Sequence, residues 1–246
     1  MRRLFAAVAF LTRLPVPSKL TFDGADVGRA TLLFPVVGAL LGGLLALAAV
    51  ALAPLLPPHL AALLVIAFGA LLTGAVHLDG LADMADGFGG GRAPDDVLRI
   101  MRDHTIGAYG AVALILVIGV KAAALAALIA HGDAVVPLVV GSSLARWASV
   151  PLGRFLPYAR EGGGLGTSLT DHVGPIESVG ATLLAGTLAL GIGGLRGLLF
   201  WAGVAAATLA NALVCRQRIG GVTGDTMGAN TEVCEALVWT LAVGIG

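Results

Sequence analysis

Long apolar stretches alternate with polar segments of unequal length along this chain. Seven stretches can be marked, at about 32–53, 59–78, 107–130, 134–152, 176–194, 197–215 and 234–246. A helix that crosses a bilayer needs about 20 apolar residues, with roughly 17 to 25 tolerated. The first four stretches meet this length comfortably and the next two adequately, whereas the seventh is short for a span. The pattern predicts an all-α fold, a polytopic membrane helix bundle of about six to seven transmembrane helices that forms one domain over residues 1–246.

Composition supports a membrane protein. Hydrophobic residues make up 57% of the chain and charged residues only 12%, about half the charged fraction of a soluble globular protein. The formal net charge is zero, which gives no argument for a nucleic-acid partner and leaves the lipid bilayer as the expected one. Cys215 and Cys234 lack metal-like spacing, and nothing in the sequence requires a disulfide between them.

Positive charge follows the long polar segments. Lys and Arg occur in the N-terminal segment 1–31 and in the long loops at about 79–106, 153–175 and 216–233, while the short loops between them carry only Arg196. The positive-inside rule then places the N-terminus and the three long loops in the cytoplasm. We expect segment 1–31 to lie in the membrane interface. We also expect a bacterial cytoplasmic (inner) membrane location, with the working surface on the cytoplasmic face.

Three carboxylates stand together in the stretch from His77 to Gly87. If the stretch is helical, Asp79, Asp83 and Asp86 lie on one face and repel one another. A divalent cation, a nearby Arg or protonation of one acid would compensate them. Oxygen ligands without His or Cys favour Mg²⁺. Helix capping or a solvated loop is the alternative interpretation of these acids.

Further polar residues on the same predicted membrane side complete a candidate phosphate site. Asp225 and Glu232 are seven positions apart, so a helix would again place them on one face, where they are candidate metal ligands. Cations and an acid near the first cluster or in the next loop are Arg99, Arg102, Asp103 and Arg154. Carboxylates that hold metal and arginines that hold phosphate fit phosphoryl transfer.

Two cations lie inside apolar stretches, where an unpaired charge is costly. Arg146 is close to the middle of its stretch, and we expect it to point into the bundle toward an acid or a phosphate. Lys121 is expected to face a cavity or to pair with a carboxylate, or to extend its ammonium toward the membrane surface.

Several of these motifs occur together in one known family. The sequence resembles cobalamin synthase, the adenosylcobinamide-GDP ribazoletransferase family, in segments 10–15, 77–87, 101–110 and 220–232. The resemblance implies a Mg²⁺-dependent membrane enzyme that joins adenosylcobinamide-GDP to α-ribazole or its 5′-phosphate and releases GMP. It implies catalytic roles for Asp79, Asp83, Asp86 and Asp103, and metal binding by the first three with Asp225 and Glu232. The implied substrate-binding residues are Arg13, Arg99, Arg102, Arg154 and Asn230.

Two other functions remain open from the residues alone. A CDP-alcohol phosphotransferase also has an Asp-Gly-rich motif, but its Ala-Arg pair after Asp-Gly is absent here, since Ala82 is followed by Asp83. A transporter could use the acids as an ion site. The sequence leaves the oligomeric state open, a homo-oligomer included.

Overall fold

The protein is built from helices joined by short connections. The computed structural model describes residues 1–164 and 166–245, so Leu165 and Gly246, the last residue of the expected stretch 234–246, lie outside the described residues. The elements are α1 (Arg2–Leu11), α2 (Gly24–Ala30), η1 (Thr31–Leu33), α3 (Phe34–Leu52), α4 (Pro58–Thr73), α5 (Val76–Gly90), α6 (Pro94–Ile100), α7 (Ala108–Ala130), α8 (Val135–Trp147), α9 (Ser149–Phe155), α10 (Thr167–His172), α11 (Pro175–Ile219) and α12 (Gly224–Gly244). The described residues form no β-strand, and the predicted all-α class is confirmed.

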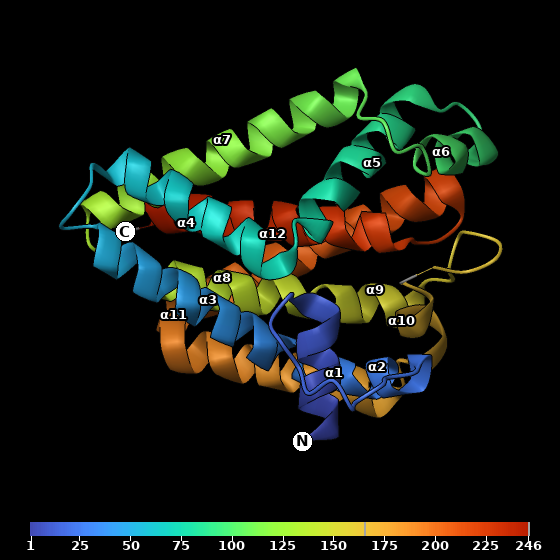
Figure 1. The fold of residues 1–246 in the computed structure, drawn as a ribbon, viewed down its shortest axis with the longest axis horizontal. Coiled ribbons are helices and arrows are strands. Elements are labelled where there is room, and N and C mark those ends of the chain that lie inside the picture. Colours follow the sequence, from blue (N-terminus) through green and yellow to red (C-terminus); the bar gives the residue numbers. More distant parts are fainter. Residues whose placement is uncertain (165, 246) are drawn as a thin grey trace.

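The long helices lie side by side and give the molecule two different ends (Figure 1). The short connections α3–α4 and α7–α8 lie at one end, and α2, α6, α9 and α10 gather at the other. Helix α1 runs crosswise to the long helices (Figure 1); the interfacial location of segment 1–31 stays a prediction.

Helix α11 is a hairpin of two helical arms. Gly194 has φ 57° and ψ −141°, which interrupts the helix. A Cβ placed on Gly197 would lie 1.9 Å from the carbonyl oxygen of Ala189, although eight residues of straight helix would separate the two by about 12 Å. The chain therefore reverses at Gly194, between the two stretches expected at 176–194 and 197–215. Arg196 just after the turn donates to Asp133 at 2.7 Å, so the hairpin closes at the end that carries the α7–α8 loop.

Helix α12 differs most from the expectation. It begins at Gly224, ten residues before the expected stretch 234–246, and replaces much of the expected loop 216–233. Thirteen of its 21 residues are buried, among them Glu232 and Glu235. Most of its polar side chains are buried against other helices, so its hydropathy does not reveal it as part of the bundle.

The number of spans depends on how broken and polar helices are counted. Among the described residues, four helical segments are long and apolar enough to cross a membrane: 24–52, 108–130, 135–155 and 175–219. A fifth is obtained by joining α4 to α5, but these two helices are bent by 92°. The expected six to seven spans are reached only if the two arms of α11 and the polar α12 are also counted. We treat α4 as the span and α5 as an arm outside it.

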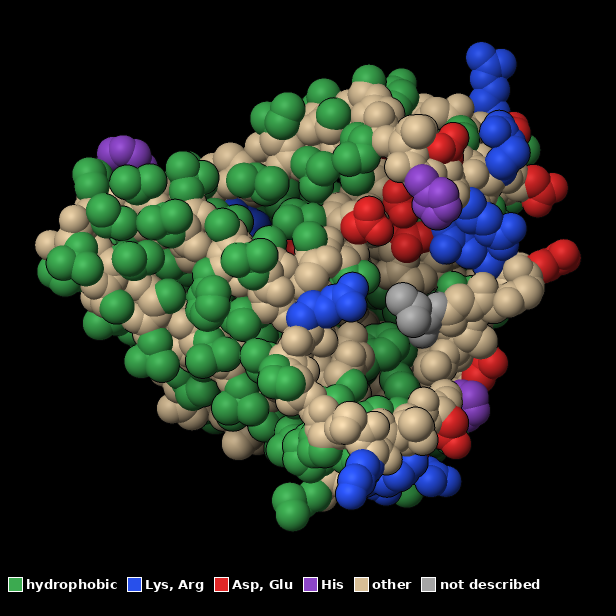
Figure 2. Space-filling view, viewed as in Figure 1, with side chains coloured by type: hydrophobic (Ala, Val, Ile, Leu, Met, Phe, Trp, Pro, Cys, Tyr) green, Lys and Arg blue, Asp and Glu red, His purple; other side chains and the backbone are tan. Residues whose placement is uncertain are grey.

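The outer surface of the bundle is apolar, as lipid contact requires. Large hydrophobic side chains are exposed on several long helices, for example Leu47, Leu71, Ile115, Leu183 and Leu199. Figure 2 shows apolar side chains covering one part of the molecule and charged side chains gathered at the end formed by α2, α5, α6 and α10. This division supports a membrane protein with one polar working end.

Candidate active site

The turn between α4 and α5 sets the direction of α5, the helix that carries the first three candidate carboxylates. Gly74 and Ala75 both have positive φ, 67° and 57°. The N–H of Ala75 bonds to the carbonyl of Ala70 at 2.8 Å, which ends α4 in a Schellman-type turn. Ala75 in this conformation costs about 1 kcal/mol or more. The strained turn swings α5 away from the axis of α4 and leads it across the polar end of the bundle.

One glycine brings the two acidic segments together. Helix α5 packs along α12, and a Cβ on Gly80 would lie only 2.7 Å from the backbone oxygen of Asp225. Asp79 adjoins this contact, and Asp83 lies one helical turn further along α5. The fold thus joins Asp79, Asp83 and Asp225 into one group, which we call the acidic cluster.

The acidic cluster is short of positive charge. Burial, together with the charges of Asp225 and Asp79, raises the pKa of Asp83 to about 6 against the opposing effect of Arg160. Burial also raises the pKa of Asp225, although Arg160 donates a hydrogen bond to its Oδ2. One guanidinium therefore faces three carboxylates, and the cluster favours a further cation or a proton.

Asp86 differs from Asp79 and Asp83 in its contacts, because both of its carboxylate oxygens accept backbone hydrogen bonds. Its Oδ2 accepts from the N–H of Gly107 at 2.7 Å, and its Oδ1 accepts from the N–H of Gly110 at 2.9 Å. These N–H groups belong to the start of α7, so Asp86 caps that helix from α5. The structure therefore supports, for this one acid, the capping interpretation left open by the sequence, while its metal role stays a prediction.

The donor chemistry of the acidic cluster fits Mg²⁺. Among the described residues, no group of three or more His, Cys, Asp or Glu side chains is arranged to hold a metal by itself. Magnesium, however, is usually bound by one or two carboxylates together with substrate phosphates. Asp79, Asp83 and Asp225 offer hard oxygen donors with uncompensated charge, so they are the residues that would hold the ion with a bound diphosphate.

A loop pairing positions Arg160. The N–H of Ala159 bonds to the carbonyl of Val222, and the N–H of Val222 bonds to the carbonyl of Pro157, both at 2.9 Å. This short parallel pairing fixes Arg160, which donates to both Asp225 and the carbonyl of Met101. Arg154 was the arginine of this region predicted to bind substrate, whereas Arg160 is the one that contacts the acidic cluster; the glycine-rich run that follows both arginines gave no means of choosing between them.

The other selected cations and Asp103 lie outside the acidic cluster. Arg99 pairs with exposed Asp96 at 3.4 Å, and Arg102 donates to the carbonyl of Glu161. Arg154 lies over the ring of Phe155. Asp103 accepts bonds from the backbone and hydroxyl of Thr105, which lower its pKa. All four belong to the polar end, and the roles assigned to them from the sequence stay predictions.

A cavity of roughly 440 Å³ opens beside the acidic cluster. Arg13 lines it, as do Arg160 and Asp225, so one cavity contains members of the first and last motifs of the chain. His77, the first residue of the acidic motif, also lines this cavity and is buried. The sequence analysis gave His77 no role.

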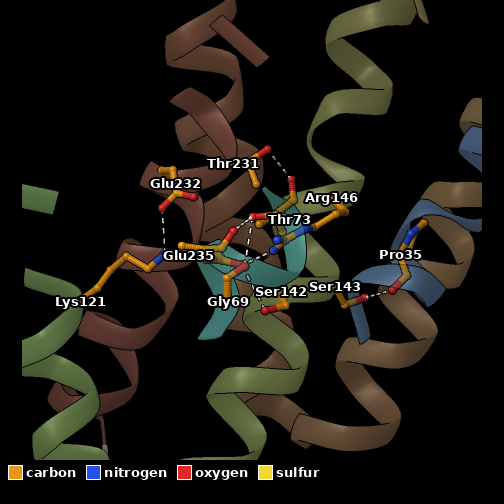
Figure 3. A network of polar contacts seen from close by, with 12 residues as sticks. Pro35, Gly69, Thr73, Lys121, Ser142, Ser143, Arg146, Thr231, Glu232 and Glu235 are labelled. Carbon is orange, nitrogen blue, oxygen red and sulfur yellow. Dashed lines mark hydrogen bonds and ion pairs between the residues drawn. The ribbon is translucent and has the colours of Figure 1, made fainter. Parts of the chain in front are cut away.

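Glu232 lies in a second charged group, deeper in the bundle. It accepts from Lys121 at 2.8 Å, and Lys121 also donates to Glu235 at 2.7 Å. Arg146 pairs with Glu235 as well, and all four side chains are buried. Figure 3 shows these side chains converging from α7, α8 and α12. The expectations that Arg146 points to an acid and that Lys121 pairs with a carboxylate are confirmed.

The structure does not bring Glu232 to Asp225. Seven residues of helix separate the two along α12, a rise of about 10 Å. Asn230 is buried, and its side-chain amide donates to the hydroxyl of Thr208 at 3.1 Å. Their roles in metal and substrate binding stay predictions, and the contacts seen here are those of bundle-stabilising side chains.

Comparison with known proteins gives consistent results over the whole chain. The model of the cobalamin-5-phosphate synthase family matches residues 3–243. Proteins named adenosylcobinamide-GDP ribazoletransferase are similar throughout: that of Syntrophobacter fumaroxidans is 39% identical over 96% of this chain and 96% of its own. The one from Chlorobium phaeobacteroides is 43% identical over 99% and 98%, and the one from Prosthecochloris aestuarii 39% over 98% and 96%. No solved structure matches significantly.

Proposed function

Because the chain belongs to the cobalamin-5-phosphate synthase family, we propose that it joins adenosylcobinamide-GDP to α-ribazole, or to its 5′-phosphate, in a Mg²⁺-dependent reaction. A ribose hydroxyl of the acceptor attacks the phosphorus that carries cobinamide. A new P–O bond forms, the diphosphate bridge breaks, and GMP leaves with the bonding electrons. The products are adenosylcobalamin, or its 5′-phosphate, and GMP.

The observation that carries this proposal is the acidic cluster, which α5 and α12 form through their contact at Gly80. Asp79, Asp83 and Asp225 are the residues that would hold Mg²⁺, and the ion would supply neutralisation of phosphate charge. Arg160 keeps Asp225 oriented through its hydrogen bond. The proton of the attacking hydroxyl passes to a carboxylate of the cluster.

Release of GMP tests the reaction. Detergent-purified protein is given adenosylcobinamide-GDP and α-ribazole, with Mg²⁺ and then with excess EDTA. We expect GMP with Mg²⁺ and its loss on chelation. Well-folded protein that releases no GMP contradicts the proposed reaction, and GMP release that persists in EDTA contradicts the metal.

A pair of carboxylate variants tests the site. Asp83→Asn should lower turnover to less than about a tenth of wild type, since it removes one charged ligand of the metal. Asp95→Asn is the matched control, because Asp95 is an exposed carboxylate on α6 at the same end of the molecule. It should retain wild-type turnover. Equal activity in the two variants would remove Asp83 from the site.

The proposal also places the polar end in the cytoplasm of a bacterium and the protein in its cytoplasmic membrane, with the N-terminus inside. The arginines and lysines of the polar end support this orientation through the positive-inside rule. Single cysteines introduced at Lys19 and at His59, which lie in segments predicted to be on opposite sides, should differ in labelling by a membrane-impermeant maleimide in intact spheroplasts. The cysteine at position 59 should react and that at 19 should not.

A further inference from the structure

The cavity beside the acidic cluster has a wall that the proposed chemistry does not explain. It extends from Asp225 and Arg160 to helix α1, where Ala9 and Phe10 line it. We propose that this cavity binds the acceptor nucleoside, with its aromatic base toward α1 and its ribose hydroxyl at the acidic cluster. This inference rests on the proposed function and assigns one of its two substrates to a place.

The volume of the cavity indicates which of the two substrates can bind in it. A volume of roughly 440 Å³ falls within the range of about 300 to 1,000 Å³ typical of sites for small organic ligands. A nucleoside is such a ligand, whereas a corrin ring with its side chains and nucleotide is several times larger. The corrinoid substrate must therefore approach the acidic cluster from the open polar end and leave this cavity to the smaller partner.

The polarity of the cavity lining favours the base of the acceptor nucleoside over the guanine of adenosylcobinamide-GDP. The larger part of the cavity lining is apolar, with contributions from Phe10, Leu11, Val76, Leu169 and Met227, and the smaller part carries hydroxyl and charged groups, among them Thr12, Ser149, Tyr158 and Arg13. Guanine presents donors and acceptors around its ring, and burying them without partners costs free energy. A methylated benzimidazole has a largely apolar outline, so its transfer to such a wall is favourable.

One polar group in the cavity lacks a partner. His77 is 9% exposed, and its Nδ1 makes no hydrogen bond within the described part of the chain. This nitrogen is itself enclosed by protein atoms, so His77 contributes to the shape of the cavity wall and not an exposed hydrogen-bonding group. The backbone of His77 is held against α12, because a Cβ on Gly228 would lie 3.2 Å from the Cα of His77.

The cavity and the acidic cluster have residues in common, and this explains how a nucleoside bound in the cavity reaches the site of phosphoryl transfer. Asp225 belongs both to the cavity lining and to the acidic cluster, and Arg160 bridges the same two places. A nucleoside seated in the cavity therefore presents its hydroxyl to the carboxylates without leaving its site. Positioning of this kind lowers the barrier, since the attacking group is already close to the phosphorus.

A cavity-filling variant tests the assignment. Ala9 lines the cavity from an exposed position on α1, so Ala9→Phe adds bulk there without touching the acids or the core. We expect the KM for α-ribazole to rise about tenfold or more, while the KM for adenosylcobinamide-GDP stays unchanged. Ala93→Phe is the matched control, because Ala93 is exposed at the same end and away from the cavity; it should leave both KM values unchanged.

The size of the base supplies a signature that misfolding would not produce. In Ala9→Phe, the loss with α-ribazole should exceed the loss with the riboside of unsubstituted benzimidazole, because the methyl groups compete with the added ring.

The outcomes separate the two proposals. A wild-type protein that releases no GMP contradicts the proposed function itself. If wild type is active, an unchanged KM for α-ribazole in Ala9→Phe overturns the cavity assignment. A raised KM for adenosylcobinamide-GDP alone overturns it too and indicates that the cavity takes the guanosine.

Discussion

The contact at Gly80 sets the spacing of the two acidic segments, and Gly80→Ala tests this directly. A Cβ at this position would lie 2.7 Å from the backbone oxygen of Asp225 and 2.8 Å from its Cα. Neither neighbour is the end of a flexible side chain, so the strain cannot be relieved by a rotamer change. Helix α5 must move away from α12, and it carries Asp79 and Asp83 with it.

The size of the shift follows from the contact distance. Ordinary contact begins near 3.4 Å, so the two backbones must separate by about 0.7 Å or more. A misplacement of about 1 Å at a catalytic site can cost roughly 100-fold in rate. We therefore expect Gly80→Ala to lower kcat about 10-fold to 100-fold. Overpacking should cost about 1 to 3 kcal/mol of stability, which a well-packed bundle tolerates.

The assay is GMP release with both substrates saturating, together with thermal unfolding of the same samples. Gly43→Ala is the matched control, because a Cβ there meets nothing within 4 Å and Gly43 also lies inside a helix. That variant should be fully active and slightly more stable, by about 0.5 to 1 kcal/mol. A folded Gly80→Ala protein with kcat within threefold of wild type would refute the reasoning.

Three further expectations follow from the structure. Glu235→Gln removes the carboxylate that buried Lys121 and Arg146 share. It should lower the free energy of unfolding in detergent by about 3 to 5 kcal/mol. Glu177→Gln, at a partly exposed position, is the control and should not; equal stability of the two variants would contradict this prediction. In EDTA, the raised pKa of Asp83, about 6, means the folded state binds the proton more tightly than the unfolded state. The contribution of Asp83 to stability should therefore fall from pH 4 to pH 6, as measured by the difference in Tm between wild type and Asp83→Asn, and added Mg²⁺ at pH 7 should raise the Tm; a pH-independent difference would count against the shift. Gly194→Ala forces a side chain onto φ 57°, ψ −141° and should cost about 1 to 3 kcal/mol, so a Tm equal to that of Gly43→Ala would exclude strain at the turn.

Local pattern was sufficient for much of the fold and for one half of the site. The apolar stretches predicted the long helices because each of these must present hydrocarbon to lipid along its own length. The spacing of Asp79 and Asp83 predicted their common face because helical periodicity is a local property. Arg146 was expected to meet an acid because an unpaired charge among apolar helices is too costly to persist.

The partners of these groups were decided only by tertiary packing. Periodicity placed Asp86 with the other acids, yet the start of α7 lies close enough to take both its oxygens. Asp225 and Glu232 share a spacing that suggests one site, but Asp225 meets α5 while Glu232 meets Lys121. No pattern along α12 distinguishes the two, because the distinction lies in which helix packs beside each turn.

Helix α12 shows the physical reason most clearly. Hydropathy measures the cost of exposing a side chain to lipid, and α12 contains Glu232 and Glu235 within a helix that lies in the bundle. Cations from α7 and α8 compensate those acids, and the sequence does not state that these helices surround α12. The sequence by itself determined which segments can lie against lipid and which acids share a helical face. The packing of distant helices decided which charges neutralise one another and which are left to bind a ligand, because an electrostatic interaction depends on distance in space and not on separation along the chain.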